Sequence, residues 1–192
     1  MHPIITFGIN PCCWSKVFKK SLLEQCLYSV TPKVKIGEDA AFTYPCLLAA
    51  ESLAYVDGCL YHYRNNAQSM TAAFDPHLTE TIFIPLDILR TYFDTDDRAL
   101  FAQYQMYAAY LLQLWVRNQA SLDCDLDRKG LRLSCARVCQ NQELRALLVS
   151  VPGALPKQVA VAVRAVQRQR SGQLYLLIKA WNLYYKLRDG RA

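Results

Sequence analysis

The longest helical pattern in the chain is RALFAQYQMYAAYLLQLWVRN, residues 98–118. Large apolar and aromatic side chains recur in it every three or four residues, a spacing that places them on one face of an α-helix. Such a stripe is typical of a face that packs into a core rather than of a cofactor site. The sequence therefore predicts a long helix that helps to form the core. The stripe consists of Tyr104, Tyr107, Leu111, Leu114 and Trp115.

The chain on the C-terminal side of this stretch also has helical periodicity, and so does the segment just before it. We therefore predict a helical C-terminal region over residues 76–192, with its boundary near Asp75 and Pro76. It ends in a basic tail. The helices predicted in this region cover 78–93, 98–118, 131–139 and 142–148, and two amphipathic stretches follow Lys157.

Residues 1–75 have a mixed pattern, in which short apolar runs typical of strands alternate with helical patterns. This mixture predicts an α/β fold that is mostly α, with a partial mixed sheet in the first region. A turn around Gly58 is expected to join two of the strands. The predicted strands are ITFGI (5–9), LAYVD (53–57) and CLYHYR (59–64), and the predicted helices cover 15–26 and 40–53, the second distorted or interrupted near Pro45.

The composition narrows the class of protein. Of the 192 residues, 53% are hydrophobic, yet no apolar run reaches the roughly 18 residues that a membrane-spanning helix needs. The first residues lack the pattern of a secretory signal, so we expect a cytoplasmic protein. The eight cysteines are scattered and lack the spacing of a zinc site, which indicates buried thiols rather than metal ligands.

Two adjacent carboxylates stand out in KIGEDAAF, residues 35–42. Glu38 and Asp39 follow a glycine and precede an apolar stretch. One interpretation is structural, because acidic side chains at a helix N-terminus are stabilised by the partial positive charge there. The other is an acid/base site. The pair alone does not decide between the two.

Three further segments lie in a characteristic order around this pair: PCCWSKVFKKSLL before it, and LAYVDGCLYHYR and NAQSMT after it. Together the four segments resemble the second half of family 2 glycosyltransferases, over about residues 8–71. The resemblance implies a GT-A fold and transfer of a sugar, with inversion, from a nucleotide donor to an acceptor hydroxyl. The acceptor would be a glycan or a glycolipid in polysaccharide or glycolipid synthesis.

The resemblance also implies roles for individual residues. Asp39 matches the base that takes the proton from the acceptor hydroxyl. Glu38 is expected to orient the loop or to bind acceptor hydroxyls. Two further residues are candidates for acceptor binding, Trp14 and Lys16. Two others are weaker candidates for binding the donor phosphates, His62 and Arg64.

The donor-binding half of such an enzyme has no counterpart in this sequence. The complete family enzyme carries a D-x-D pair that binds a divalent metal, Mn or Mg, and this chain lacks that pair at the expected position. The acidic stretches TDD (95–97) and DCDLD (123–127) are better interpreted as helix-start or loop carboxylates. We therefore expect no metal site and no sugar transfer by the isolated chain, which is a truncated, split or degenerate enzyme.

The tail from Lys157 onward holds eight basic residues and one acidic residue, whereas the whole chain has a net charge of +6. Two interpretations of the tail, over 157–188, stay open. In the first, its apolar faces pack on the preceding helices and its basic residues remain in water; in the second, it contacts an anionic membrane surface, peripherally at the inner face. An alternative for the whole chain is a non-catalytic helical interaction protein. No nucleic-acid-binding motif is present. The predicted apolar face of the last stretch is Leu174, Leu177, Ile178, Trp181 and Tyr185.

Overall fold

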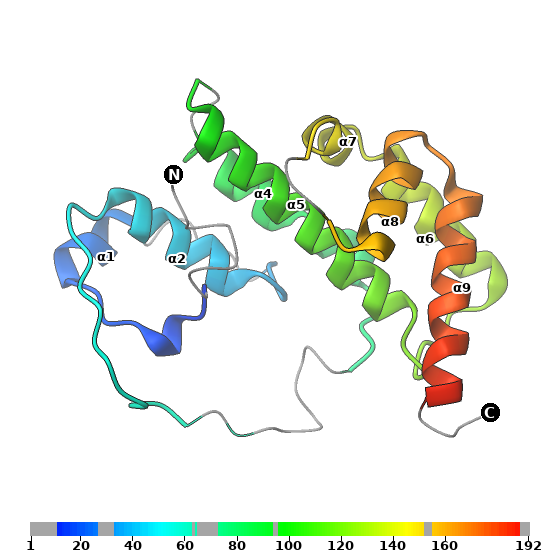
Figure 1. Cartoon of the computed structure of the whole chain (residues 1–192), viewed down its shortest axis with the longest axis horizontal. Coiled ribbons are helices and arrows are strands. Elements are labelled where there is room, and N and C mark those ends of the chain that lie inside the picture. Colours follow the sequence, from blue (N-terminus) through cyan, green and yellow to red (C-terminus); the bar gives the residue numbers. More distant parts are fainter. Residues whose placement is uncertain are drawn as a thin grey trace.

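The computed structural model describes residues 11–26, 33–62, 64, 73–93, 96–151 and 155–188. In these residues the regular structure is helical (Figure 1). A short 3₁₀ turn, η1, and two helices precede an extended segment, and seven helices follow it. The elements are η1 Cys13–Ser15, α1 Lys20–Cys26, α2 Glu38–Ala49, α3 Leu78–Thr81, α4 Ile84–Arg90, α5 Arg98–Gln119, α6 Arg128–Gln140, α7 Gln142–Leu148, α8 Lys157–Gln167 and α9 Ser171–Arg188.

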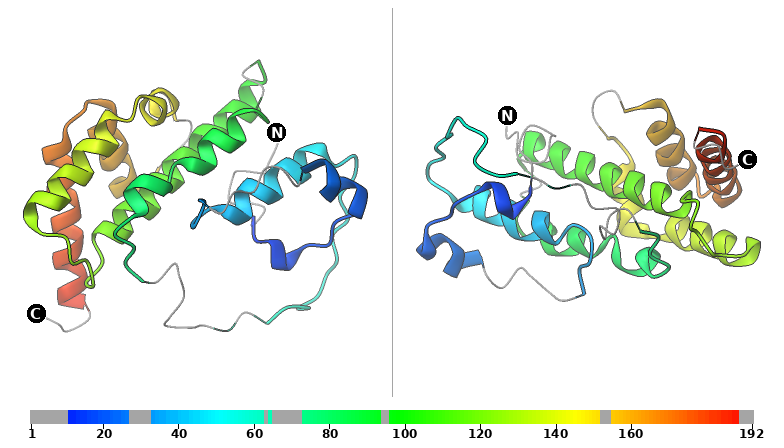
Figure 2. Two further views of the ribbon diagram at one scale, coloured as in Figure 1. Left: turned by 180° about the vertical axis from the view of Figure 1, so that it is seen from behind. Right: turned by 90° about the horizontal axis from the view of Figure 1, so that it is seen from below.

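The predicted long helix is confirmed as α5, which runs through the middle of the molecule (Figures 1 and 2). Helices α7, α8 and α9 pack against it, and α6 packs against α8 and α9. The core between these helices is mostly apolar, although Gln103, Gln105 and Gln119 of α5 are also buried in it. Trp115 is completely buried, and its Nε1–H donates to Thr79 Oγ1 at 3.0 Å, which ties α5 to α3.

Helix α2 packs against α4, and this contact joins the first part of the chain to the helical part. The Tyr44 ring of α2 meets the Tyr107 ring of α5 edge to face, with centroids 5.7 Å apart. Helix α2 continues through Pro45, so it is not interrupted there. Its buried face includes Ala40, Tyr44 and Leu47.

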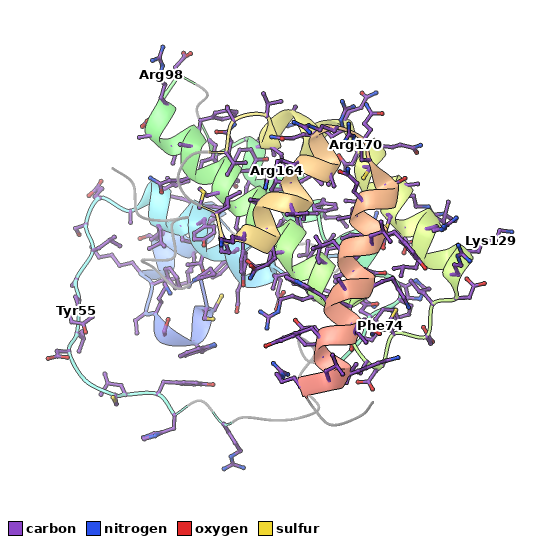
Figure 3. The ribbon with its side chains drawn as sticks, turned by 45° about the vertical axis from the view of Figure 1, so that its right-hand side comes forward. Tyr55, Phe74, Arg98, Lys129, Arg164 and Arg170 are labelled. Carbon is purple, nitrogen blue, oxygen red and sulfur yellow. The ribbon has the colours of Figure 1, made fainter. Side chains whose placement is uncertain are left out.

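The predicted sheet is wrong for the described residues, which contain no strand and therefore no α/β or GT-A-like mixed sheet. Residues 53–57 and 59–62 are extended and exposed. Tyr55 is 89% exposed and projects from a segment that has no helix beside it (Figure 3). A strand needs a second strand to pair its backbone groups, and none lies there. The segment 5–9 lies outside the described residues.

The helix predictions hold, with shifted bounds. The expected helix over 78–93 is two helices, α3 and α4, because Pro85 has no N–H to donate to the carbonyl of Thr81. The helix expected to start at Ser15 starts at Lys20, and Ser15 belongs to η1 instead.

No helix in the described part of the chain has the length and the hydrophobicity that crossing a membrane requires.

Candidate functional site

The N-terminus of α2 is built on a left-handed glycine. Gly37 precedes the helix with φ of 90°, and its carbonyl accepts the N–H of Ala41 at 2.9 Å. A Cβ at Gly37 would lie 2.9 Å from the Tyr107 hydroxyl and 3.0 Å from Pro85 Cγ. Both the backbone angle and the close approach thus require glycine. Helix α2 therefore starts where the Gly37 backbone approaches Pro85 of α4 and Tyr107 of α5.

Asp39 lies in the first turn of α2 and accepts a hydrogen bond from the first residue of η1. The Cys13 N–H donates to Asp39 Oδ1 at 3.4 Å, and the Cys13 thiol lies 3.5 Å from the Thr43 hydroxyl. Burial and the neighbouring Asp39 carboxylate raise the pKa of the Cys13 thiol to about 11. The Asp39 carboxylate is half-buried, and it also lines the pocket described below.

Glu38 is half-buried beside Asp39, and its pKa is raised above the ordinary value, chiefly by burial and further by the charge of Asp39. Hydrogen bonds to the backbone of Glu38 and Gly37 oppose this rise. Because its carboxylate contacts the backbone at the helix start, Glu38 has the structural role expected of an acidic residue at a helix N-terminus. The same carboxylate faces the pocket, so one role does not preclude the other.

A cavity of about 800 Å³ lies where the start of α2, the second half of α5 and the end of α9 come together. Figure 1 shows the N-terminal end of α2 directed toward the middle of α5. The cavity is formed by residues far apart in the sequence. Its polar and aromatic lining includes Lys35, Glu38, Asp39, Tyr107, Tyr110, Arg117, Asn118, Asp123, Tyr185 and Arg188.

The Tyr107 hydroxyl is a buried polar group with no hydrogen-bond partner among the described residues. The side chain is 2% exposed, and it lines the cavity beside Gly37. Burial raises the pKa of this hydroxyl well above its ordinary value, so it remains a protonated donor. An unpaired buried donor costs free energy, which a ligand oxygen placed in the cavity would recover.

The cavity carries charges of both signs. Glu38 and Asp39 form an acidic edge on α2, whereas Arg117 of α5 and Arg188 of α9 contribute cationic side chains. The Arg188 guanidinium also lies over the Tyr185 ring, 5.3 Å from its centroid. Such a mixture of carboxylates, cations and tyrosines suits a polar ligand that offers several hydroxyl groups.

The other predicted site residues lie outside this cavity. Trp14 is 41% exposed and stacks on Tyr61, with ring centroids 4.4 Å apart. Lys16 Nζ donates to the Cys12 carbonyl at 3.0 Å, and burial lowers its pKa. His62 and Arg64 are exposed on the extended segment. Of the six candidates, only Glu38 and Asp39 line the cavity. Lys16 lies outside it but close enough to Asp39 for the two charges to interact.

The sequence did not identify the residues of α5 and α9 that line the cavity opposite the start of α2. Tyr107 and Leu114 were assigned to helix packing, and Tyr185 to an apolar face of the tail. Their packing role is real, but the same side chains also line the cavity. A hydroxyl on an otherwise apolar face, as in Tyr107 and Tyr110, was the one available signal. It does not reveal which other segment lies opposite.

Two of the acidic residues that the sequence predicts at helix starts are hydrogen-bonded to the backbone there. Asp97 Oδ1 accepts the N–H groups of Ala99 and Leu100 at the start of α5, and Asp127 Oδ1 accepts that of Gly130 at the start of α6. For these two residues the prediction of helix-start carboxylates is confirmed. In the described ranges, no three His, Cys, Asp or Glu side chains are grouped as metal ligands.

Comparisons with models of protein families, with curated protein sequences and with solved structures gave no match.

Proposed function

We propose that this chain is the acceptor-binding part of a glycosyltransferase, in which Asp39 is the general base. The observation that supports this proposal best is the cavity, because it places the Glu38–Asp39 pair opposite tyrosines contributed by α5 and α9. Carboxylates that accept hydrogen bonds from hydroxyl groups, next to aromatic rings, suit a saccharide. The order of sequence segments that resemble family 2 glycosyltransferases supports the same assignment.

The proposed reaction is a single displacement. Asp39 accepts the proton of the acceptor hydroxyl while its oxygen attacks the anomeric carbon of the donor sugar. The bond from that carbon to the nucleotide diphosphate breaks, and the diphosphate leaves with the bonding electron pair. The configuration at the anomeric carbon is inverted. In this scheme Tyr107 donates a hydrogen bond to an acceptor oxygen and holds it near Asp39.

The donor site must come from outside the described residues, which hold no nucleotide-binding sheet. A base without a bound donor has nothing to activate, so we expect the chain alone to bind an acceptor without transferring sugar. A divalent metal of the complete enzyme would likewise have to be bound elsewhere. We place the protein in the cytoplasm, at the inner face of the membrane. The eight free thiols suit a reducing compartment.

Acceptor binding is the first test. Saturation-transfer NMR with a panel of neutral and acidic oligosaccharides, on the chain as it is, should show binding that Tyr110→Ala abolishes. Asp125→Asn, which removes an exposed carboxylate outside the cavity lining, is the matched control and should leave binding unchanged. Binding that survives in Tyr110→Ala would overturn the assignment of this cavity.

Transfer is the second test, in the assembled enzyme that also holds the donor. There Asp39→Asn should abolish transfer while acceptor binding persists, and near-normal turnover would contradict the role of Asp39. If the chain binds neither saccharides nor, in the assembly, nucleotide sugars, the alternative of a non-catalytic helical interaction protein replaces the proposal.

A further inference from the structure

Helix α9 has apolar side chains on two opposite faces. On the inner face, Leu174 and Ile178 are fully buried against the neighbouring helices, as packing of the tail on the core predicts. On the outer face, Leu176 is 66% exposed, Leu183 57% and Leu187 64%. The exposed leucines are therefore not the apolar face predicted from the sequence, and they take no part in the core.

The outer leucines form one continuous stripe. Leu176, Leu183 and Leu187, together with the exposed Ala180, are spaced by three or four residues, so they lie one above another along the helix. At 1.5 Å per residue the stripe is about 16 Å long. Tyr184, 58% exposed, lies directly beside it. Seen nearly end-on in the right-hand view of Figure 2, α9 has α8 on one side and open space on the other.

The charges beside this stripe are positive. Lys179 and Lys186 are exposed along one flank, seven residues apart and hence on the same side of the helix. On that flank Arg132 of α6 lies over the Tyr175 ring, 5.2 Å from its centroid. Neither α8 nor α9 contains an acidic residue. Lys179 also lies within electrostatic reach of Cys124, in the acidic loop 123–127.

We propose that this outer stripe of α9 docks on an anionic membrane surface, with the helix axis parallel to the membrane plane. Three leucines enter the apolar edge of the lipid layer, the tyrosine lies at the headgroup level, and the lysines extend to the lipid phosphates. The positive flank favours an anionic lipid surface over an uncharged apolar partner. This inference does not depend on the proposed function.

The docked orientation has a consequence for the cavity. Tyr185 and Arg188, on the last turn of α9, line it. Tyr185 lies on the side of the helix opposite the leucine stripe. The cavity would therefore lie within about one helix diameter, roughly 10 Å, of the lipid headgroups.

The test is co-sedimentation of the full chain with vesicles of phosphatidylcholine alone and of phosphatidylcholine mixed with phosphatidylglycerol. Binding is expected only to the anionic vesicles and should weaken with added salt. Replacing all three leucines by serine should reduce binding more than tenfold. Lys179→Gln together with Lys186→Gln should reduce it about fivefold for each lysine.

Two matched controls keep the test specific. Leu53→Ser with Leu60→Ser removes exposed apolar side chains from the extended segment, and Lys19→Gln with Lys20→Gln removes two exposed lysines from the first region. Neither pair should change binding. Circular dichroism confirms that each variant is folded.

Three results would overturn the proposal. One is equal binding to both kinds of vesicle without any effect of salt. Another is a loss of vesicle binding in the control variants as large as that in the α9 variants. The third is a dimer that the leucine-to-serine variant dissociates, with no vesicle binding, which would assign the stripe to a second copy of the chain.

Discussion

Residues 73–188 and residues 11–64 differ in what holds them in place. In the first, apolar stripes of successive helices close on one another, and large side chains such as Trp115 and Leu111 are completely buried. In the second, α2 has a buried face, but the chain beyond it is extended and exposed. A helix pairs its own backbone groups, so a helical sequence needs only an apolar neighbour, whereas a strand needs a second strand as well.

The joint between the two regions is α2, and the candidate site lies at its N-terminal end. The contact includes the Tyr44 ring against the Tyr107 ring, the close approach of the Gly37 backbone to Pro85, and the buried side chains of Ala40 and Leu47. The geometry of the cavity therefore depends on this contact, because Glu38 and Asp39 line it from the start of α2. Substitutions in the core and substitutions at the contact of α2 are expected to lower the free energy of unfolding by different amounts. Measuring both tests the comparison directly.

The largest effect is expected in the core. Trp115→Ala should lower the free energy of unfolding by about 3–5 kcal/mol, because it removes a fully buried ring and leaves a cavity. Leu60→Ala, at an 81% exposed position of the extended segment, should change it by less than about 0.5 kcal/mol. Urea unfolding followed by circular dichroism measures both. Comparable losses in the two variants would mean that the extended segment is part of the core.

Gly37→Ala tests the contact between α2 and the helices α4 and α5, and should lower the free energy of unfolding by about 1–3 kcal/mol. The alanine would have to keep the positive φ of Gly37, and its Cβ would lie 2.9 Å from the Tyr107 hydroxyl. Gly172→Ala in α9 is the matched control, because a Cβ there meets nothing within 4 Å. It should stabilise the protein by about 0.4–1 kcal/mol. The comparison of regions fails if both alanines stabilise the protein in thermal or urea unfolding.

Removing the hydroxyl of either of two tyrosines of α5 should have a smaller effect on stability, and the effect should differ between the two. The Tyr104 hydroxyl donates to the Leu86 carbonyl at 2.5 Å, whereas the Tyr107 hydroxyl has no partner among the described residues. Tyr104→Phe should therefore lower the free energy of unfolding by about 1 kcal/mol, and Tyr107→Phe should leave it unchanged or raise it. Saccharide binding should weaken in Tyr107→Phe only. The role given to Tyr107 is wrong if its phenylalanine variant loses stability as Tyr104→Phe does.

The smallest effect is a pH dependence from Glu38. Its pKa is raised in the folded protein, chiefly by burial, so folding favours the protonated form. The folded state keeps this advantage below the unfolded pKa and loses it as the pH rises through the folded pKa. Glu38→Gln should thus be the more stable protein at neutral pH, and the difference should shrink in acid. Unfolding curves across this pH range measure it, and a difference that grows in acid would contradict the raised pKa.

Some parts of the candidate site were predictable from the sequence. The glycine followed by two acids indicated both a helix start and an acidic pair, and α2 does start at Glu38. The carboxylates at positions 97 and 127 were correctly predicted as helix-start residues. These features depend on neighbours along the chain, so a local pattern is enough to reveal them.

The other parts were not predictable. The alternation in LAYVD and CLYHYR predicted strands, yet a strand depends on a distant partner that the pattern does not specify. The pairing of Trp14 with Tyr61, and the approach of Tyr185 to Asp39 across one cavity, are likewise contacts between segments far apart in the sequence.

The sequence by itself determined where the helices lie, because the apolar period, the capping carboxylates and the prolines act within a few residues. The tertiary structure decided which apolar side chains stay outside on a helix that has them on more than one face. Helix α9 has apolar side chains on two opposite faces, and the position of α6 and α8 leaves Leu176, Leu183 and Leu187 outside while Leu174 and Ile178 are buried. The physical reason is that burial depends on which surfaces meet, and that depends on the packing of the whole chain.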